Sequence, residues 1–349
     1  MIGGEGPGSR YPLVGVLLTF RRADALSRML DELTAQTRPL DWLYVVDNDP
    51  TRENEYRVID HGSVNPGVTY IPASINLGSA GGWALGMSRA IQEWAGRCAW
   101  LALADDDDPP WSRTLLSDME SFAHRMLEID PRVGQVGLGG ARMNLRTGRA
   151  VRLSDDELVG AVPVHMIGTG TWPLFRVDVL KEVGPLLGPL FFGFSEIEMG
   201  MRLQRSGYNQ YCNGPLRFER RRDIGRLGMT VRPHIRRTGT PWRRYYRLRN
   251  LIWILRTYGY PLAAARVTLL VGIAKPIVGV MTWAPNRWIN LRMAIRASID
   301  AWTGRLGRRV DPPTLYPPKK MPRALVQQHH GPSCLEAGGS LDGPGNSRS

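Results

Sequence analysis

Four consecutive aspartates, Asp105–Asp108, directly follow a short apolar run, and two prolines close the segment. Two ionised carboxylates about 4 Å apart repel each other by roughly 1 kcal/mol in water and by about 4 kcal/mol at the dielectric of a protein surface. A turn needs one aspartate, or two, so four indicate that a positive charge belongs beside them. Mg²⁺ typically binds one or two protein carboxylates together with phosphate oxygens. The run therefore predicts a site for a divalent cation that carries a diphosphate.

A second interpretation of the aspartates is structural. Acidic residues near the N-terminus of a helix stabilise it by about 0.3–1 kcal/mol each, and a helix is predicted over Ser112–Ile129. This effect accounts for Asp108 but not for all four carboxylates.

The elements that must position this site alternate between strand and helix. The apolar run Leu13–Phe20 predicts a strand buried on both faces, and Arg22–Gln36 has apolar residues at the spacing of one helical face. Three more strands are predicted at Trp42–Val46, Val68–Ile71 and Ala99–Ala104, with a helix over residues 83–94 before the last of them. Four β–loop–α units in about 115 residues predict an α/β fold with a parallel, doubly wound sheet.

Ligands bind at the carboxyl ends of the strands in such sheets. Polar residues and glycines follow all four predicted strands: Thr19-Phe20-Arg21, Asp47-Asn48, Asn76 with Gly78, Gly81 and Gly82, and the aspartates. We therefore expect these loops to meet at one edge of the sheet.

The middle of the chain is less regular. Strands are predicted at residues 134–143 and 162–167, and a helix at residues 176–183. Ser195 is a predicted N-cap, and Glu198 three residues later completes a capping box. The helix that follows should run from Glu196 to about Arg205 and end at Gly207.

The chain becomes basic and rich in aromatic residues from Pro241. The predicted helix there is amphipathic, with Tyr245, Leu248, Ile252 and Leu255 on one side and Arg243, Arg247 and Asn250 on another. Two more apolar and basic helices should follow to about Trp302, and the Pro/Gly/Ser-rich remainder reads as disordered. The predicted organisation is a flexible N-terminus (1–10), an α/β domain (11–240), a basic helical region (241–307) and a disordered tail (308–349).

The composition limits the binding partners and the cellular compartment that suit this chain. The 349-residue chain has a formal net charge of +13, which suits solubility, an anionic membrane surface, nucleic acid or a phosphate-bearing substrate. Cys98, Cys212 and Cys334 are odd in number and lack CxxC spacing, so they are predicted to be free thiols in a reducing compartment. The N-terminus lacks a signal-peptide pattern. Lys275 and Pro276 interrupt the longest apolar segment, Val267–Trp283, which predicts a buried or interfacial helix and not a membrane span.

Six segments, in order, carry a resemblance to a known family: VGVLLTFRR, YVVDND, NLGSAGGWALGM, ALADDDDPP, FFGFSEIEMGMRLQRSGY and PWRRYYRLRN. The chain resembles a family 2 glycosyltransferase of GT-A fold over roughly residues 11–260, and it is most similar to the bacterial branch with galactofuranosyl- and rhamnosyltransferases. The resemblance implies inverting transfer of a sugar, galactofuranose or rhamnose, from a nucleotide-diphosphate donor to a glycan or lipid-linked acceptor in cell-envelope polysaccharide synthesis. It also implies Mg²⁺ or Mn²⁺ as cofactor.

The resemblance assigns roles to residues. Asp105 and Asp107 would be the DxD pair for the metal and diphosphate, with Asp106 near the donor sugar or ribose. Glu196 would be the catalytic base. The remaining implied donor contacts are Asp47 at the nucleotide base, Thr19 and Arg21 near the ribose and diphosphate, and Asn76 with a Gly81-Gly82 turn along the donor. Arg202 would face the diphosphate or brace Glu198.

Two positions depart from the family pattern. Ser195 stands where the family usually has the first acid of a pair. Many relatives place a metal-binding His after the base helix, but GPLRFERRRDIG has none, which leaves Glu219, His234 or water to complete the shell. Several of the implied residues also have a structural alternative. Glu196 could be an acidic residue in the first turn of a helix, Asp47 could form an Asx-turn, and the glycines could serve a tight turn.

Three other functions fit this sequence less well. A dinucleotide-dependent dehydrogenase needs GxGxxG after the first strand, where this chain has Thr19-Phe20-Arg21-Arg22. A nucleotidyltransferase would use the same metal and diphosphate chemistry but more often has a Gly/Arg/Lys-rich loop there. A nucleic-acid-binding protein is supported by charge alone, and four aspartates would repel a phosphate backbone. We therefore expect no nucleic-acid partner.

The basic, amphipathic C-terminal helices predict a location instead. We expect a cytoplasmic enzyme that these helices hold at the inner face of the cell membrane.

Overall fold

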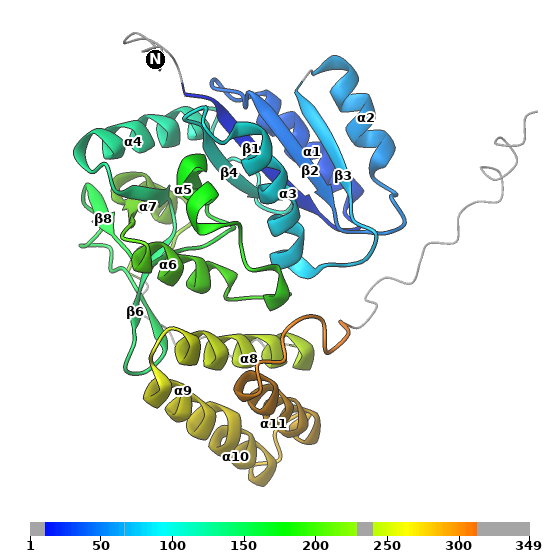
Figure 1. Cartoon of the computed structure of the whole chain (residues 1–349), viewed down its shortest axis with the longest axis vertical. Coiled ribbons are helices and arrows are strands. Elements are labelled where there is room, and N and C mark those ends of the chain that lie inside the picture. Colours follow the sequence, from blue (N-terminus) through cyan, green and yellow to red (C-terminus); the bar gives the residue numbers. More distant parts are fainter. Residues whose placement is uncertain (1–10, 66, 229–239, 313–349) are drawn as a thin grey trace, which may run out of the picture. The chain divides into compact units, whose positions relative to one another are not determined.

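The computed structural model, which describes residues 11–65, 67–228 and 240–312, contains an eight-stranded sheet with strand order β3-β2-β1-β4-β10-β5-β11-β8 (Figure 1). The first four strands are β1 (Leu13–Thr19), β2 (Trp42–Asp47), β3 (Val68–Pro72) and β4 (Trp100–Asp105). They pair in parallel, with β1 at the centre between β2 and β4. Every residue of β1 is buried, as expected for a strand that is covered on both faces. The predicted α/β fold with a mostly parallel sheet is confirmed.

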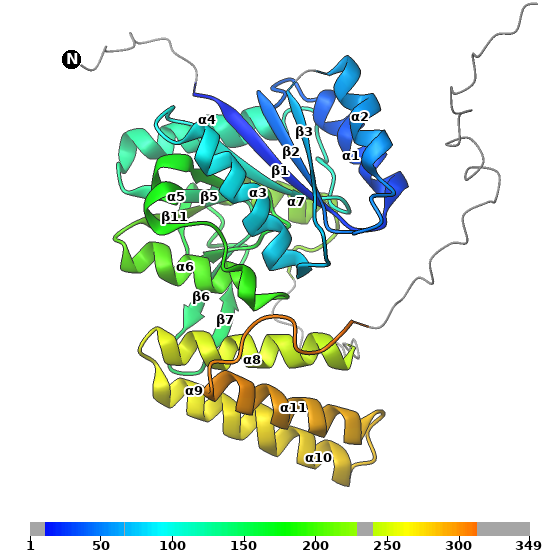
Figure 2. The same ribbon diagram turned by 45° about the vertical axis from the view of Figure 1, so that its right-hand side comes forward.

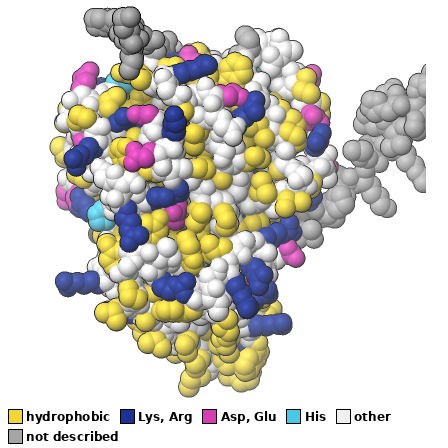
Figure 3. Space-filling view, in the orientation of Figure 1, with side chains coloured by type: hydrophobic (Ala, Val, Ile, Leu, Met, Phe, Trp, Pro, Cys, Tyr) yellow, Lys and Arg dark blue, Asp and Glu magenta, His cyan; other side chains and the backbone are white. Residues whose placement is uncertain are grey.

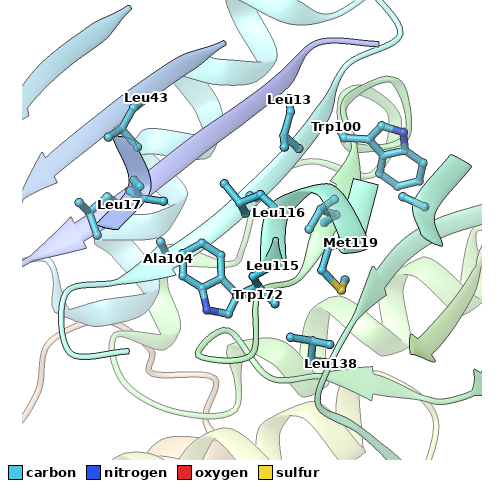
Figure 4. Packing of buried hydrophobic residues seen from close by; sticks show 14 of the residues in the cluster. Leu13, Leu17, Leu43, Trp100, Ala104, Leu115, Leu116, Met119, Leu138 and Trp172 are labelled. Carbon is cyan, nitrogen blue, oxygen red and sulfur yellow. The ribbon is translucent and has the colours of Figure 1, made fainter. Parts of the chain in front are cut away.

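Helices cover both faces of this sheet (Figure 1). Their bounds are α1 (Ala23–Thr34), α2 (Glu55–Val64), α3 (Gly78–Trp94), α4 (Leu115–Ile129), α5 (Val177–Val183), α6 (Ser195–Arg205) and α7 (Gly214–Asp223). Leu13 and Leu17 of β1 pack with α1 and α4 in one core, where Leu116 and Trp172 also lie (Figure 4). The alternate residues Val14 and Val16 pack with α3, α5 and α6 in a second core. Fully burying a Leu or Val contributes about 1.5–3 kcal/mol, so these two cores fix the sheet between its helices.

The segment 134–143, predicted as one strand, forms two strands in different sheets. β5 (Val133–Gly137) belongs to the large sheet, and β6 (Gly140–Asn144) belongs to a small antiparallel sheet with β7 (Arg149–Arg152) and β9 (Met166–Ile167). The chain changes sheet at Gly139, where a Cβ would lie 2.4 Å from Thr171 Cγ2. The predicted strand 162–167 divides in the same way, into β8 (Ala161–Pro163) and β9.

Two short strands of the large sheet were not predicted. β10 (Leu174–Arg176) runs antiparallel between β4 and β5, and β11 (Asn209–Asn213) pairs in parallel with β5. Three to five residues are too few to show a period in the sequence.

Gly81 and Gly82 lie inside α3, which begins at Gly78, so the predicted Gly81-Gly82 turn is wrong. The glycines instead let the helix approach the sheet closely. A Cβ at Gly82 would lie 2.4 Å from Leu18 Cδ1, and one at Gly86 would lie 2.5 Å from Val16 Cγ1.

The C-terminal helices are α8 (Pro241–Thr257), α9 (Pro261–Val267), the π-helical segment η2 (Thr268–Ala274), α10 (Lys275–Met281) and α11 (Arg287–Trp302). The predicted apolar side of α8 is buried, but so are Tyr246, Arg249 and Asn250, so the prediction that Asn250 lies on a polar side is wrong. The reason is that α8 is covered on two sides (Figure 2). On one side it packs against α9 and α11, and on the other it contacts the short helix η1 (Gly188–Leu190) and the loop that follows η1.

Pro261–Met281 forms a continuous helical stretch that is long and apolar enough to cross a membrane, by length and composition only. The sequence was expected to hold no such stretch because Lys275 and Pro276 interrupt it. The π-helical turns of η2 end at Ala274, and Pro276 lies in the first turn of α10, where a proline is tolerated because its missing N–H donor is not needed there.

The predicted tail contains an ordered start. The Tyr246 hydroxyl donates a hydrogen bond to the Val310 carbonyl (2.8 Å) and accepts one from the Arg309 N–H (2.9 Å). Residues 308–311 therefore bind α8, and the prediction of disorder is wrong for them; residues 1–10, 313–349 and His234 lie outside the described residues. Cys98 and Cys212 are free thiols, as predicted, and Cys334 is outside the described residues.

The close packing of α3 on the sheet can be tested with Gly86→Ala. The new methyl would lie 2.5 Å from Val16 Cγ1 and 2.8 Å from Val46 Cγ2, on stiff β-branched side chains. Overpacking costs typically 1–3 kcal/mol, and Gly→Ala in a helix returns about 0.5–1 kcal/mol. We expect a net loss of about 1–2 kcal/mol in the free energy of unfolding, measured by urea denaturation. The matched control is Gly279→Ala in α10, where the nearest atom is 3.8 Å away and a small gain is expected; equal stabilities of the two variants would contradict the packing argument.

Candidate active site

The carboxylates of Asp105, Asp106 and Asp107 gather at the carboxyl end of β4. One oxygen from each lies within 4.8 Å of the others, an arrangement that could hold a metal ion. The backbone places them there, because Asp105 pairs in register with Leu18 at the end of β1 and the Asp106 N–H donates to the Leu18 carbonyl (3.3 Å). The two residues predicted as the DxD pair, Asp105 and Asp107, therefore lie close together, and Asp106 lies with them.

Two side chains of the β1 loop contact this cluster. Thr19 Oγ1 donates a hydrogen bond to Asp106 Oδ2 (2.8 Å), and Arg22 Nη1 lies 2.9 Å from Asp106 Oδ1 and 2.5 Å from Asp107 Oδ2. Asp106 is buried with both oxygens engaged, whereas Asp107 is exposed. Arg22 was not among the predicted site residues. The sequence feature that could have identified Arg22 is its position in the predicted loop after β1, next to Arg21.

Burial and neighbouring negative charge both raise the pKa values of the cluster. Burial, then the charges of Asp107 and Asp106, raise the pKa of Asp105 to about 7. Burial also raises the pKa of Asp106, against the opposing hydrogen bond from Thr19 and charge of Arg22. Burial and the neighbouring carboxylates therefore disfavour the ionised forms of Asp105 and Asp106, and a cation bound beside them would favour those forms.

Asp108 points to a different part of the structure. Burial raises its pKa, and the charges of Arg220 and Arg217 on α7 oppose that rise. It does not cap the following helix as expected, because α4 begins only at Leu115 and its N-cap residue is Thr114.

The β2 loop lies next to the acidic cluster, since Asp47 pairs in register with Thr19. Asp47 is fully buried and accepts hydrogen bonds from the Asp49 N–H (3.1 Å) and the Tyr70 hydroxyl (3.0 Å). Burial raises the pKa of Asp47, and these hydrogen bonds oppose the rise. The hydrogen bond from the Asp49 N–H to the Asp47 carboxylate, two residues earlier, is the bond of an Asx-turn. An Asx-turn was the structural alternative for Asp47 in the sequence analysis.

Arg21 is oriented along the same loop. Its backbone has a φ of 56°, a left-handed conformation that costs energy for a residue with a Cβ. Its Nε lies 2.9 Å from Asp49 Oδ2. The ion pair holds the guanidinium beside the β2 loop, next to the predicted donor position.

Asn48 and Asn76 join the β2 and β3 loops. Asn48 accepts a hydrogen bond from the Leu77 N–H (2.8 Å) and donates to the Gly78 carbonyl (3.0 Å), while Asn76 Oδ1 accepts from the Gly78 N–H (2.8 Å). Gly78 has a φ of +71°, and a Cβ there would lie 2.2 Å from the Phe191 carbonyl oxygen. A glycine is required at this position, and it brings the start of α3 against the loop that precedes α6.

The start of α6 differs from its prediction. Phe194, in a left-handed conformation with a φ of 65°, is the N-cap residue, and Ser195 lies inside the helix. The predicted capping box is wrong because Glu198 is engaged elsewhere: it accepts hydrogen bonds from Arg202 Nη2 (2.8 Å) and the Tyr258 hydroxyl (2.7 Å). Arg202 also donates to the Val183 carbonyl (2.6 Å). Of the two positions implied for Arg202, its contacts match the brace for Glu198.

Glu196 lies half-buried in the first turn of α6. Burial raises its pKa above the usual value, and the charge of Arg247 and a hydrogen bond from the Ser195 hydroxyl (3.5 Å) oppose the rise. A carboxylate with a raised pKa is a better proton acceptor than an exposed one, which suits a general base.

Helix α8 fixes the loop that leads to Glu196. Asn250 Nδ2 donates to the carbonyls of Leu190 (3.0 Å), Phe192 (3.1 Å) and Gly193 (2.8 Å), and Arg249 Nη2 donates to the Leu190 carbonyl (2.9 Å). Both side chains are fully buried. Sequence reasoning missed this contact because the pattern places Asn250 among arginines.

A further prediction concerns the metal shell. Glu219 is exposed on α7, and it is not in the cluster of metal-ligand side chains that the described part of the chain contains.

Comparison with known proteins places the acidic cluster in a family. Residues 16–184 match the model for glycosyl transferase family 2. This region is a family 2 glycosyltransferase domain. Glu196 lies beyond the matched residues.

Individual relatives extend the comparison of this family 2 domain. The chain is 36% identical over 202 residues to a galactofuranosyltransferase, GlfT1, of Mycobacterium tuberculosis H37Rv. The aligned region covers 55% of this chain and 64% of the relative. It is 34% identical over 206 residues to GlfT1 of Mycolicibacterium smegmatis, covering 55% of this chain and 65% of the relative. The chain thus matches slightly less than two thirds of the length of these relatives. The solved mannosyltransferase PcManGT of Pyrobaculum calidifontis, in complex with GDP-Man and Mn²⁺, is 15% identical with a TM-score of 0.48, covering 86% of this chain and 89% of that one.

The α8 contact predicts a strong effect of Asn250→Leu on stability. Leucine has the same number of side-chain heavy atoms and the same branching, but it cannot donate to the three carbonyls, and each buried polar group left without a partner costs about 1–3 kcal/mol. We expect a loss of about 2–4 kcal/mol in the free energy of unfolding, measured by urea denaturation. Asn290→Leu, on the partly exposed surface of α11, is the control and should change stability by less than about 0.5 kcal/mol. An unchanged midpoint for Asn250→Leu would contradict the contact.

Proposed function

We propose that this chain is an inverting glycosyltransferase that moves a sugar from a nucleotide-diphosphate donor to an acceptor hydroxyl. The observation that carries the proposal is the cluster of three carboxylates within 4.8 Å, at the carboxyl end of β4 in a family 2 glycosyltransferase domain. The half-buried Glu196 supplies the second group that this chemistry needs.

Asp105 and Asp107 are the proposed metal ligands. Their fit to a divalent cation rests on the carboxylate oxygens that lie within 4.8 Å of one another and on the exposure of Asp107. Burial, together with the charges of Asp107 and Asp106, raises the pKa of Asp105 to about 7, and a bound cation would offset both effects. Mg²⁺ and Mn²⁺ both accept oxygen ligands of this kind. When bound, the cation offsets the charge that develops on the departing diphosphate.

The donor would lie along the loops that follow β1, β2 and β3. Arg22 is placed beside Asp106 and Asp107, where its guanidinium can pair with diphosphate oxygens. Thr19 and Arg21 border the same position, and the buried Asp47 offers a carboxylate to the nucleotide base. Asn76 and the start of α3, where Gly81 and Gly82 lie, line the donor from the other side. Asp106, held by Thr19, stays near the ribose or sugar.

Glu196 is the proposed base. In a single displacement, the acceptor oxygen forms a bond to the anomeric carbon while the bond from that carbon to the diphosphate breaks. The acceptor proton passes to the Glu196 carboxylate, and the electron pair of the broken bond leaves with the diphosphate. The reaction inverts the anomeric centre because one nucleophile attacks opposite one leaving group.

Galactofuranose is the proposed sugar, with rhamnose as the alternative. The relatives at 34–36% identity are galactofuranosyltransferases, which supports galactofuranose as the transferred sugar. The proposed acceptor, a cell-envelope glycan or a lipid-linked precursor, rests on the family resemblance of the sequence. The match to glycosyltransferases favours sugar transfer over the nucleotidyltransferase and nucleic-acid-binding alternatives.

Replacing Glu196 with Gln tests the base. The amide keeps the size and hydrogen-bonding reach of the side chain but cannot accept the proton. We expect the dissociation constant of the nucleotide-sugar to stay within about twofold, and turnover with a galactofuranose or rhamnose donor to fall by about 10² or more. Glu128→Gln, at an exposed position on α4, is the control. Equal losses of donor affinity and turnover would point instead to a structural role at the start of α6.

Asp107→Ala tests the metal site separately. We expect transfer and its dependence on Mg²⁺ or Mn²⁺ to disappear. The metal-free protein should keep its thermal stability or gain slightly, since one of the charges that repel Asp105 is removed. The measurements are a donor-turnover assay with each cation and with a chelator, and thermal unfolding without metal. Full activity of the variant, or wild-type activity that withstands strong chelation, would refute the metal assignment.

A further inference from the structure

The C-terminal helices present an apolar surface that no described part of the chain covers. We call residues 261–302, which comprise α9, η2, α10 and α11, the apolar hairpin. Fourteen of the twenty-three exposed large hydrophobic side chains among the described residues lie in it. Leu262 is 86% exposed, and at the turn of the hairpin Met281 and Trp283 are 73% and 76% exposed. Figure 3 shows apolar side chains gathered at this end of the molecule.

The inner side of the hairpin explains why its large side chains face outward. Alanines fill the contact with α8, among them Ala264, Ala297 and Ala301, which are fully buried. A Cβ at Gly272 would lie 2.5 Å from Ser298 Oγ, so η2 and α11 approach each other closely. Small residues inside and large residues outside reverse the usual pattern of a soluble helical pair.

Basic side chains surround this apolar surface. Residues 240–312 contain thirteen Lys and Arg but only two acidic residues, a formal excess of eleven positive charges. Both acidic residues are engaged, Asp300 with the Tyr245 hydroxyl (2.5 Å) and Asp311 with Arg308 (2.8 Å). Arg287 stacks on the Trp283 ring at 4.2 Å from its centroid. In Figure 3, Lys and Arg side chains lie beside the apolar end of the molecule.

A groove on α11 combines the two properties. Its volume is about 580 Å³, and its walls include Trp288 and Ile295 together with Arg292, Arg305 and Arg309. Apolar walls beneath several guanidinium groups match an acyl chain joined to a phosphate.

We propose that the apolar hairpin is a docking surface for a bilayer that contains anionic phospholipids. The turn with Trp283 enters the interfacial region, and the arginines bind lipid phosphates, one of them in the α11 groove. A second copy of the chain is the poorer occupant, because it would bring the same excess of positive charge to the same surface.

The hairpin lies in one leaflet and does not span. The second arm, α11, is 16 residues long, about 24 Å at 1.5 Å per residue, and a hydrocarbon core is about 30 Å thick. That arm also carries exposed Arg292 and Arg296, which are costly at the bilayer centre. The sequence predicted attachment through the basic region from Pro241 to about Arg309, which includes this hairpin. The apolar residues of α8, the first helix of that region, are buried against the hairpin and the loop before α6, so the apolar contact with lipid is assigned to residues 261–302. The docking does not depend on the proposed reaction.

Flotation of the full chain with vesicles tests the proposal. We expect binding to vesicles of phosphatidylcholine with phosphatidylglycerol at low salt, and loss of binding at high salt or with phosphatidylcholine alone. Replacing Met281 and Trp283 with Ser should lower the partition coefficient by about tenfold or more. Replacing Arg292 and Arg309 with Gln should lower binding to anionic vesicles by a similar factor.

The matched control is the double variant Ile129→Ser and Val159→Ser, whose side chains are 74% and 77% exposed outside the hairpin, and it should bind as the wild type does. Thermal unfolding checks that each variant is folded. The proposal is overturned if the wild type fails to float at low salt, binds neutral vesicles equally well, or floats undiminished in both hairpin variants. Resistance of the bound protein to alkaline extraction would show a spanning helix instead. A dimer in light scattering that the Met281 and Trp283 substitutions abolish would show that a second copy covers the surface.

Discussion

Mutual repulsion among Asp105, Asp106 and Asp107 is the constraint around which the candidate site is arranged. The three carboxylates are forced together because β4 ends beside β1, and the backbone of Asp106 is bound to Leu18. Thr19 and Arg22 compensate part of this charge, yet burial and the neighbouring carboxylates together raise the pKa of Asp105 to about 7. A fold stabilised by only about 5–15 kcal/mol retains such a repulsion at a cost. A cation and a diphosphate, bound together, would remove it.

Helix α8 lies between the apolar hairpin and the loop that leads to the candidate site. Arg249 and Asn250 bind the loop before α6, and Arg247 acts on the charge of Glu196. The opposite side of α8 packs against the apolar hairpin. One helix therefore contacts both the loop that leads to the proposed catalytic base and the proposed membrane-docking surface. In the proposed function, this connection would hold the site close to a lipid-linked acceptor.

The first half of the fold could be predicted because its strands are buried on both faces and so appear as continuous apolar runs, such as Leu13–Phe20. The acidic cluster could be predicted because parallel strands bring their carboxyl ends to one edge. The change of sheet at Gly139 could not, since it depends on how closely Thr171 approaches. The burial of Asn250 depends on carbonyls some 60 residues away, and the N-cap at Phe194 on a left-handed conformation that its sequence does not suggest. In each case a tertiary contact overrode the local pattern.

Calorimetric titration of the protein with a panel of nucleoside diphosphates, at saturating Mg²⁺ or Mn²⁺ and again with a chelator, tests the central claim most directly. If the crowded carboxylates exist to hold a cation and a diphosphate together, at least one nucleoside diphosphate should bind with the cation present, and its affinity should fall by about tenfold or more without it. Binding that is equally tight in the chelator, or no binding of any nucleoside diphosphate with the cation present, would contradict the account.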